Sequence, residues 1–104
     1  MRYVELFVAG ALLLNAVPHL TSGLQGHPFP TPFGKPRGVG NSSAFVNFLW
    51  GAFNLCAGLA MVVRRPLVIG PNLDCLVLAA GALLLGTYLS LHFGRVNEER
   101  AAVS

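Results

Sequence analysis

Three long apolar segments constrain the fold of this chain more than any other feature of its sequence. They cover residues of about 3–24, 43–63 and 73–93, and each is long enough for a helix of roughly 20 residues. At ~1.5 Å per residue, such a helix crosses the ~30 Å hydrocarbon core of a bilayer. Hydrophobic residues make up 54% of the chain and charged residues 11%. We therefore predict an all-α membrane protein.

The segments between the apolar runs carry strong helix breakers. Residues 25–42 contain four prolines, which prevent a continuous helix and favour extended backbone. The second break, RRPLVIGPN, leaves Asn72 or Asp74 to cap the next helix. The sequence therefore predicts one domain over residues 1–104, with three transmembrane helices in an up-down-up bundle and a Pro/Gly-rich first loop.

The two ends of the chain allow further expectations. The first apolar segment is not expected to be a cleaved signal peptide, because Glu5 interrupts the basic start and AVPHL is a poor cleavage site. The polar tail, residues 95–104, either frays or extends the third helix into water. Positive charges divide almost evenly between the two membrane sides, and the Arg64/Arg65 pair favours an N-terminus in the cytoplasm.

Charged residues cluster at the ends of the apolar segments and argue against several function classes. Glu5, Arg64, Arg65 and Asp74 fall at the end of the bundle that carries the N-terminus, where they are expected to pair or to meet lipid headgroups. No acid or base lies near the bilayer centre, which argues against proton-coupled transport of cations. No basic face suits nucleic acid, and no nucleophile with a base, carboxylate pair or cysteine cluster indicates an enzyme. Both cysteines are interpreted as packing residues.

The opposite end, which we call the histidine end, gathers residues from all three helices. His19 lies near the end of the first helix, Asn47 near the start of the second and His92 near the end of the third. Alternating helix directions place these three side chains at a similar depth, beneath the loop that carries His27. If the protein has a site, it is expected here.

Three interpretations of the histidine end are open. The histidines can be structural and bond to backbone or headgroups. Alternatively, His19 and His92, with Asn47 and Asn15, bind a quinone or another polar-headed ligand. In the third, His19, His27 and His92 ligate a metal, or a histidine ligates haem iron. The cofactor is therefore unknown, with quinone and haem as candidates.

Small and amide residues recur at helical spacing and predict close helix packing. Asn15 shares its face with Ala11 and His19, and Pro18 is expected to kink or end this first helix. The second and third helices carry comparable rows, which serve packing or bind a partner: Asn47, Gly51, Asn54 and Gly58 in one, and Ala82, Gly86 and Ser90 in the other.

One pattern resembles a known group of proteins. NAVPH, followed by Gly23, Gly26, FPTPFGKP and VNFLWGAFNL, resembles small bacterial three-span membrane proteins, over about residues 10–60. The resemblance implies no activity and transfers no site residue. Size and the helix-end histidine are also similar to small accessory subunits of respiratory and other membrane complexes. We therefore expect a non-catalytic accessory or assembly subunit that contacts lipid and other membrane subunits or itself. The alternative is a ligand- or redox-cofactor-binding membrane protein.

Overall fold

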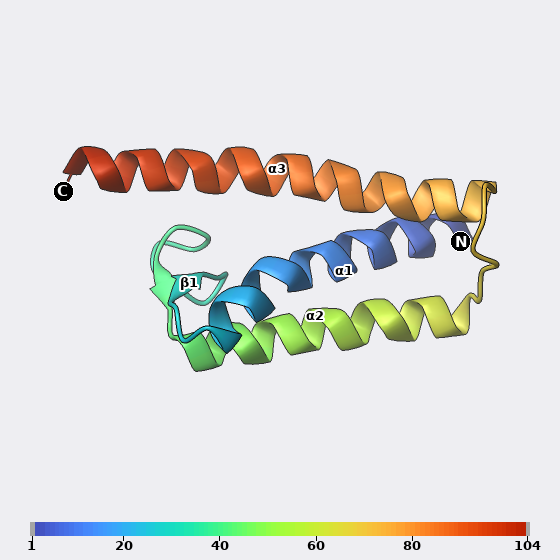
Figure 1. Cartoon of the computed structure of the whole chain (residues 1–104), viewed down its shortest axis with the longest axis horizontal. Coiled ribbons are helices and arrows are strands. Elements are labelled where there is room, and N and C mark those ends of the chain that lie inside the picture. Colours follow the sequence, from blue (N-terminus) through green and yellow to red (C-terminus); the bar gives the residue numbers. More distant parts are fainter. Residues whose placement is uncertain (1, 104) are drawn as a thin grey trace.

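Three long helices make up most of the protein (Figure 1). A computed structural model describes residues 2–103, in which α1 spans Arg2–Leu24, α2 spans Ala44–Arg64 and α3 spans Leu73–Val103. Each helix is long and apolar enough to cross a membrane, which indicates a multi-pass membrane protein. α1 continues for six residues beyond Pro18, so this proline does not end the helix.

The first loop and the C-terminal tail are more ordered than the sequence alone indicates. Two short strands, β1 (Phe29–Pro30) and β2 (Asn41–Ser42), pair antiparallel within the loop. α3 has 31 residues and is therefore about 46 Å long at ~1.5 Å per residue. It exceeds the ~30 Å hydrocarbon core, so the polar tail continues the helix beyond an apolar span. At its start, the Asn72 side chain accepts the Cys75 amide hydrogen at 2.9 Å and caps the helix.

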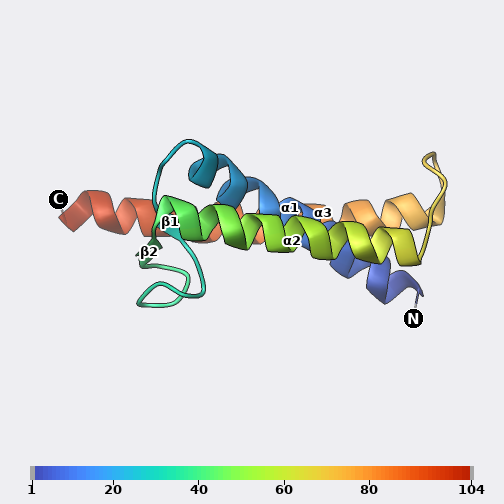
Figure 2. The same ribbon diagram turned by 90° about the horizontal axis from the view of Figure 1, so that it is seen from below.

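α1 is the central element of the bundle. It lies between α2 and α3 and packs along both (Figures 1 and 2), whereas the principal helix contacts do not include an α2–α3 pair. The four buried residues of α2 are Asn47, Gly51, Asn54 and Gly58, which form its face toward α1. In α3, Gly81 and Val96 are buried, while Ser90 is exposed and its hydroxyl donates to the Thr87 carbonyl of its own helix.

Two glycines allow α1 and α3 to approach closely. A Cβ atom on Gly10 would lie 2.0 Å from the Leu78 carbonyl oxygen, and one on Gly81 would lie 2.0 Å from the Phe7 carbonyl oxygen. Both distances are far below van der Waals contact with backbone atoms that cannot rotate away. The crossing therefore requires glycine at both positions.

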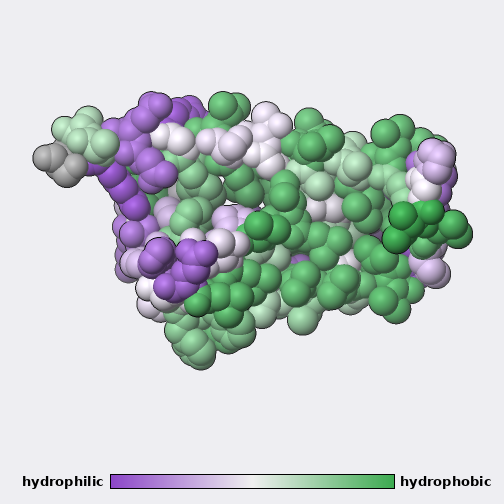
Figure 3. Space-filling view, in the orientation of Figure 1, coloured by the Kyte–Doolittle hydropathy of each residue, from purple (hydrophilic) through white to green (hydrophobic). Residues whose placement is uncertain are grey.

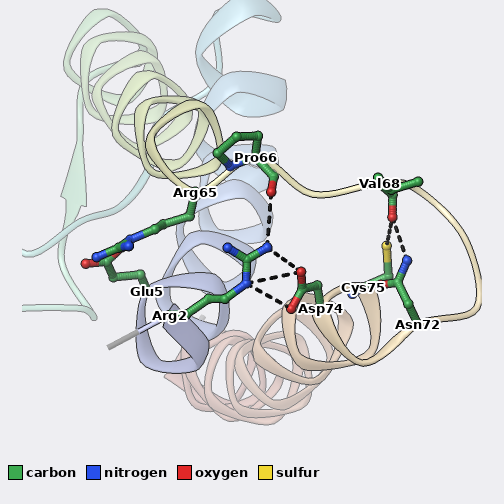
Figure 4. Close-up of polar contacts among 8 residues, drawn as sticks. All are labelled: Arg2, Glu5, Arg65, Pro66, Val68, Asn72, Asp74 and Cys75. Carbon is green, nitrogen blue, oxygen red and sulfur yellow. Dashed lines mark hydrogen bonds and ion pairs between the residues drawn. The ribbon is translucent and has the colours of Figure 1, made fainter.

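Polar residues occupy the two ends of the bundle, with an apolar band between them (Figure 3). At the N-terminal end, Arg65 Nε donates to Glu5 Oε2 at 2.6 Å and joins α2 to α1. Arg2 pairs with Asp74 and also donates to the Pro66 carbonyl at 3.1 Å (Figure 4), which joins α1 to α3 and to the connecting loop. These two ion pairs hold all three helices in register at this end.

Gly10→Ala tests the close α1–α3 crossing. Its methyl group would clash with the Leu78 carbonyl, so we expect the free energy of unfolding to fall by ~1–3 kcal/mol. Gly94→Ala is the matched control, because no atom lies within 4 Å of a Cβ at that position of α3. Thermal unfolding in detergent compares the two, and equal stability of both variants would contradict the assigned packing.

Candidate functional site

The Asn47 side chain organises the histidine end. It is fully buried, and its Nδ2 donates to the Phe29 carbonyl at 2.9 Å, the Ser43 carbonyl at 3.1 Å and the Ser42 carbonyl at 3.2 Å. This amide group therefore ties the start of α2 to both strands of the loop. Three surrounding carbonyls also determine which way the amide points, because only its NH₂ group can donate to them.

The orientation of Asn47 fixes the tautomer of His19. Asn47 Oδ1 lies 2.7 Å from His19 Nδ1, and an amide oxygen can only accept a hydrogen bond. His19 Nδ1 therefore carries the proton, and in the neutral ring Nε2 has a free lone pair. His19 is 3% exposed, and no residue in the described range 2–103 bonds to Nε2. The ring thus offers one unused acceptor.

Aromatic rings surround this imidazole. Phe29 packs edge-on against it at 5.4 Å between centroids, and Trp50 does so at 6.5 Å. Phe93 of α3 reaches Phe29 at 4.7 Å, which connects the loop to the third helix. Trp50 Nε1 is buried and has no hydrogen-bond partner within residues 2–103. A buried donor without an acceptor costs about 1–3 kcal/mol, so this group would gain from an acceptor.

His92 has a different role from His19. Its Nε2 lies 2.6 Å from the Gly38 carbonyl oxygen and must donate to it, so this nitrogen is already occupied. Tyr88, one turn earlier in α3, stacks on the His92 ring at 5.7 Å. Arg100 adds a second attachment, because its guanidinium donates to Asn41 Oδ1 at 3.1 Å and to the Val39 carbonyl. α3 thereby holds the tip of the loop.

The loop itself is built around Thr31. The Thr31 side chain is buried, its hydroxyl lies 2.5 Å from Ser42 Oγ, and it accepts the Phe33 amide hydrogen at 3.0 Å. The Thr31 carbonyl accepts the Gly38 amide hydrogen at 3.1 Å, which closes the intervening turn. These bonds make the loop an ordered cover over the ends of the helices.

A cavity of about 140 Å³ lies beneath this cover. Side chains from all three helices line it: Asn15, His19, Trp50, Tyr88 and His92. The loop contributes Thr31 and Gly38 to its walls. Its size is close to that of an engineered ~150 Å³ protein cavity that holds one benzene molecule. The histidine end therefore has space for a single ring-sized group.

The predicted site residues divide into three sets. Asn15, His19 and His92 line the cavity, whereas Asn47 supports His19 from behind and His27 is exposed outside the cavity lining. In the described part of the chain, no three His, Cys, Asp or Glu side chains are grouped to hold a metal ion. The cavity also lacks room for a haem, whose macrocycle contains four pyrrole rings. Both cysteines are free.

Trp50 and Tyr88 were not among the predicted site residues. Each could have been found from helical spacing, because Trp50 follows Asn47 by three residues and Tyr88 precedes His92 by four. Both spacings place the aromatic side chain on the same helix face as a predicted site residue. An aromatic residue inside an apolar segment gives no separate signal, since most such residues serve packing.

A larger apolar groove adjoins the cavity. It has a volume of about 400 Å³ and follows α1 between α2 and α3, from Phe7 to Asn15. Asn15, Tyr88 and Leu89 line both spaces, so the cavity and the groove are neighbours. At their junction, Asn15 Nδ2 donates to Asn54 Oδ1 at 3.1 Å. The groove exists because α2 and α3 pack on α1 without closing over it.

Comparison of the chain with protein families, with curated proteins and with solved structures finds no match. The function is therefore argued from the geometry of the cavity.

Asn47→Ala tests the role assigned to this amide. Loss of the side chain leaves the Phe29 and Ser42 carbonyls and His19 Nδ1 without their partner, so we expect the free energy of unfolding to fall by about 2 kcal/mol or more. Limited proteolysis of the loop should become faster. Asn97→Ala, at an exposed position of α3, is the control and should leave both measurements unchanged. A stable Asn47→Ala variant with a resistant loop would refute this assignment.

Proposed function

We propose that this protein is a three-span, up-down-up membrane protein that binds a small ligand in the cavity at the histidine end. One observation carries the proposal: a ring-sized, partly open cavity is lined by His19, which has an unused acceptor, and by Trp50, whose indole N–H is buried and unpartnered within residues 2–103. Ligand sites in proteins combine apolar walls with a few convergent polar groups of this kind. The proposed activity is binding, with no catalytic step.

The accessory-subunit role stays a prediction. In the sequence, the row of small and amide residues in α2 suits either internal packing or a partner. Asn47, Gly51, Asn54 and Gly58 are all buried within the bundle, so this row does not favour a partner protein. The apolar outer surfaces of the helices are equally suited to lipid. The cavity therefore gives the ligand-binding function the stronger support.

The cavity can be probed through Trp50, which is the single tryptophan of the chain. We expect the indole N–H resonance in a ¹H–¹⁵N spectrum to shift saturably when a one-ring compound such as 4-methylphenol is added. Leu89→Phe should abolish the shift, because Leu89 lines the cavity and the larger side chain fills it. Leu91→Phe is the matched control on the exposed side of α3. A shift that never saturates, or that survives Leu89→Phe, would refute the proposal.

The proposed topology places the first loop and the C-terminus on one side of the membrane and the N-terminus on the other. With an N-terminus in the cytoplasm, Lys35→Cys should react with a membrane-impermeant maleimide on intact cells. Ile69→Cys should react only after permeabilisation. Cys56→Ser and Cys75→Ser provide the unreactive background, and Ile69 is a suitable position because it is 90% exposed. Labelling of both sites from outside would contradict the three-span topology.

A further inference from the structure

We infer that the ligand is a hydroxyl-bearing amphiphile, with its hydroxyl group in the cavity beside His19 Nε2 and its apolar chain in the adjoining groove along α1. This inference rests on the proposed ligand-binding function and specifies its chemistry. Two observations carry it: the fixed tautomer of His19, and the groove beside the cavity, which shares Asn15, Tyr88 and Leu89 with it.

The unused acceptor of His19 selects a group that donates a hydrogen bond. His19 Nδ1 is committed to Asn47, so the neutral ring presents only the lone pair of Nε2 and requires a donor. A hydroxyl group has one hydrogen to donate, so it can meet this need of His19 Nε2.

Other head groups meet these requirements less well. A quinone carbonyl has no hydrogen for His19 Nε2 and would place two lone pairs opposite each other. An ammonium group would need a counter-charge, and no acidic side chain lines the cavity within the described residues. Among quinone-type compounds, the site therefore favours the reduced, hydroxyl form.

The groove determines where an attached chain can lie. Positions 7 and 19 of α1 are separated by twelve residues, or about 18 Å along the helix axis at ~1.5 Å per residue. A ligand with its hydroxyl group at His19 can therefore extend an apolar chain toward the middle of the membrane. Lipid solvates such a chain as well as a protein surface does, so the groove provides space for the chain and adds little affinity.

Two matched ligands test the hydroxyl group. The full chain in lipid nanodiscs is titrated with 4-decylphenol and with its methyl ether, and the Trp50 indole resonance reports binding. The ether keeps the ring, the chain and an acceptor oxygen but has no hydrogen to donate. We expect it to bind about tenfold more weakly, since it leaves His19 Nε2 without a donor. Equal affinity of the two compounds would overturn the inference, while the proposed ligand site would stand.

His19→Asn removes the acceptor Nε2 but can keep the hydrogen bond to Asn47. The asparagine amide can take the position of Nδ1 and still donate to Asn47, but nothing replaces Nε2. This variant should lose about tenfold in affinity for 4-decylphenol and should bind the methyl ether like the wild type. His27→Asn, at an exposed loop position, is the control. Unchanged preference for the phenol in His19→Asn would contradict the role of Nε2.

Ala11→Phe tests the groove separately from the cavity. Ala11 lines the groove and is absent from the cavity lining, so the larger side chain should obstruct a long chain and leave the head-group site open. We expect 4-decylphenol to bind about tenfold more weakly and 4-methylphenol to bind as in the wild type, which also shows that the variant is folded. Val4→Phe, on the exposed side of α1, is the control. Undiminished binding of 4-decylphenol would overturn the groove assignment, and failure of every one-ring compound would overturn the proposed function itself.

Discussion

The hydrogen bonds of the Asn47 side chain determine the chemistry of the histidine end. An amide group has a donor face and an acceptor face, and here the backbone carbonyls of the loop occupy the donor face. The acceptor face is then left for His19, whose proton position follows from it. A purely structural contact between α2 and the loop thus decides that the buried imidazole presents a lone pair to the cavity.

The cavity depends in turn on the central position of α1. Gly10 and Gly81 bring α3 against one side of α1, and the buried row of α2 packs against another. Two close contacts with the same central helix do not require α2 and α3 to contact each other, so a groove remains between them. At the histidine end the loop crosses this opening and is held there by His92 and Arg100. The loop thereby partly covers the cavity that lies next to the groove.

The sequence predicted the three helices and the depth of their residues along the bundle, because both follow from hydrophobicity and helix length. The expected starts and ends of the three apolar helices lie within one residue of those observed, except for the C-terminus of α3. The sequence did not determine where α3 ends, because charged residues such as Glu98 and Arg100 are compatible both with a frayed tail and with a helix in water. Length arithmetic also predicted that His19 and His92 would lie at similar depth, and both line one cavity.

The sequence could not separate the three histidines by role, because this depends on contacts between distant residues. His27 lies close to His19 in the sequence, yet the turn after α1 leaves it exposed. His19 and His92 both follow an apolar helix, but the first bonds to a side-chain oxygen and the second to a loop carbonyl. Likewise, the two-residue ladder of the loop depends on the pairing of Phe29 with Ser42, which proline content alone does not indicate.

The position of the cavity within the bundle is consistent with a ligand that enters from the membrane. His19 lies five residues before the end of α1, about 8 Å below the end of the helix at ~1.5 Å per residue. The loop, held by α3, covers the side toward water, whereas the groove is open along the apolar band. A water-soluble molecule would have to displace the ordered loop. An amphiphile already in the bilayer has its hydroxyl group near this depth and can reach the cavity through the groove.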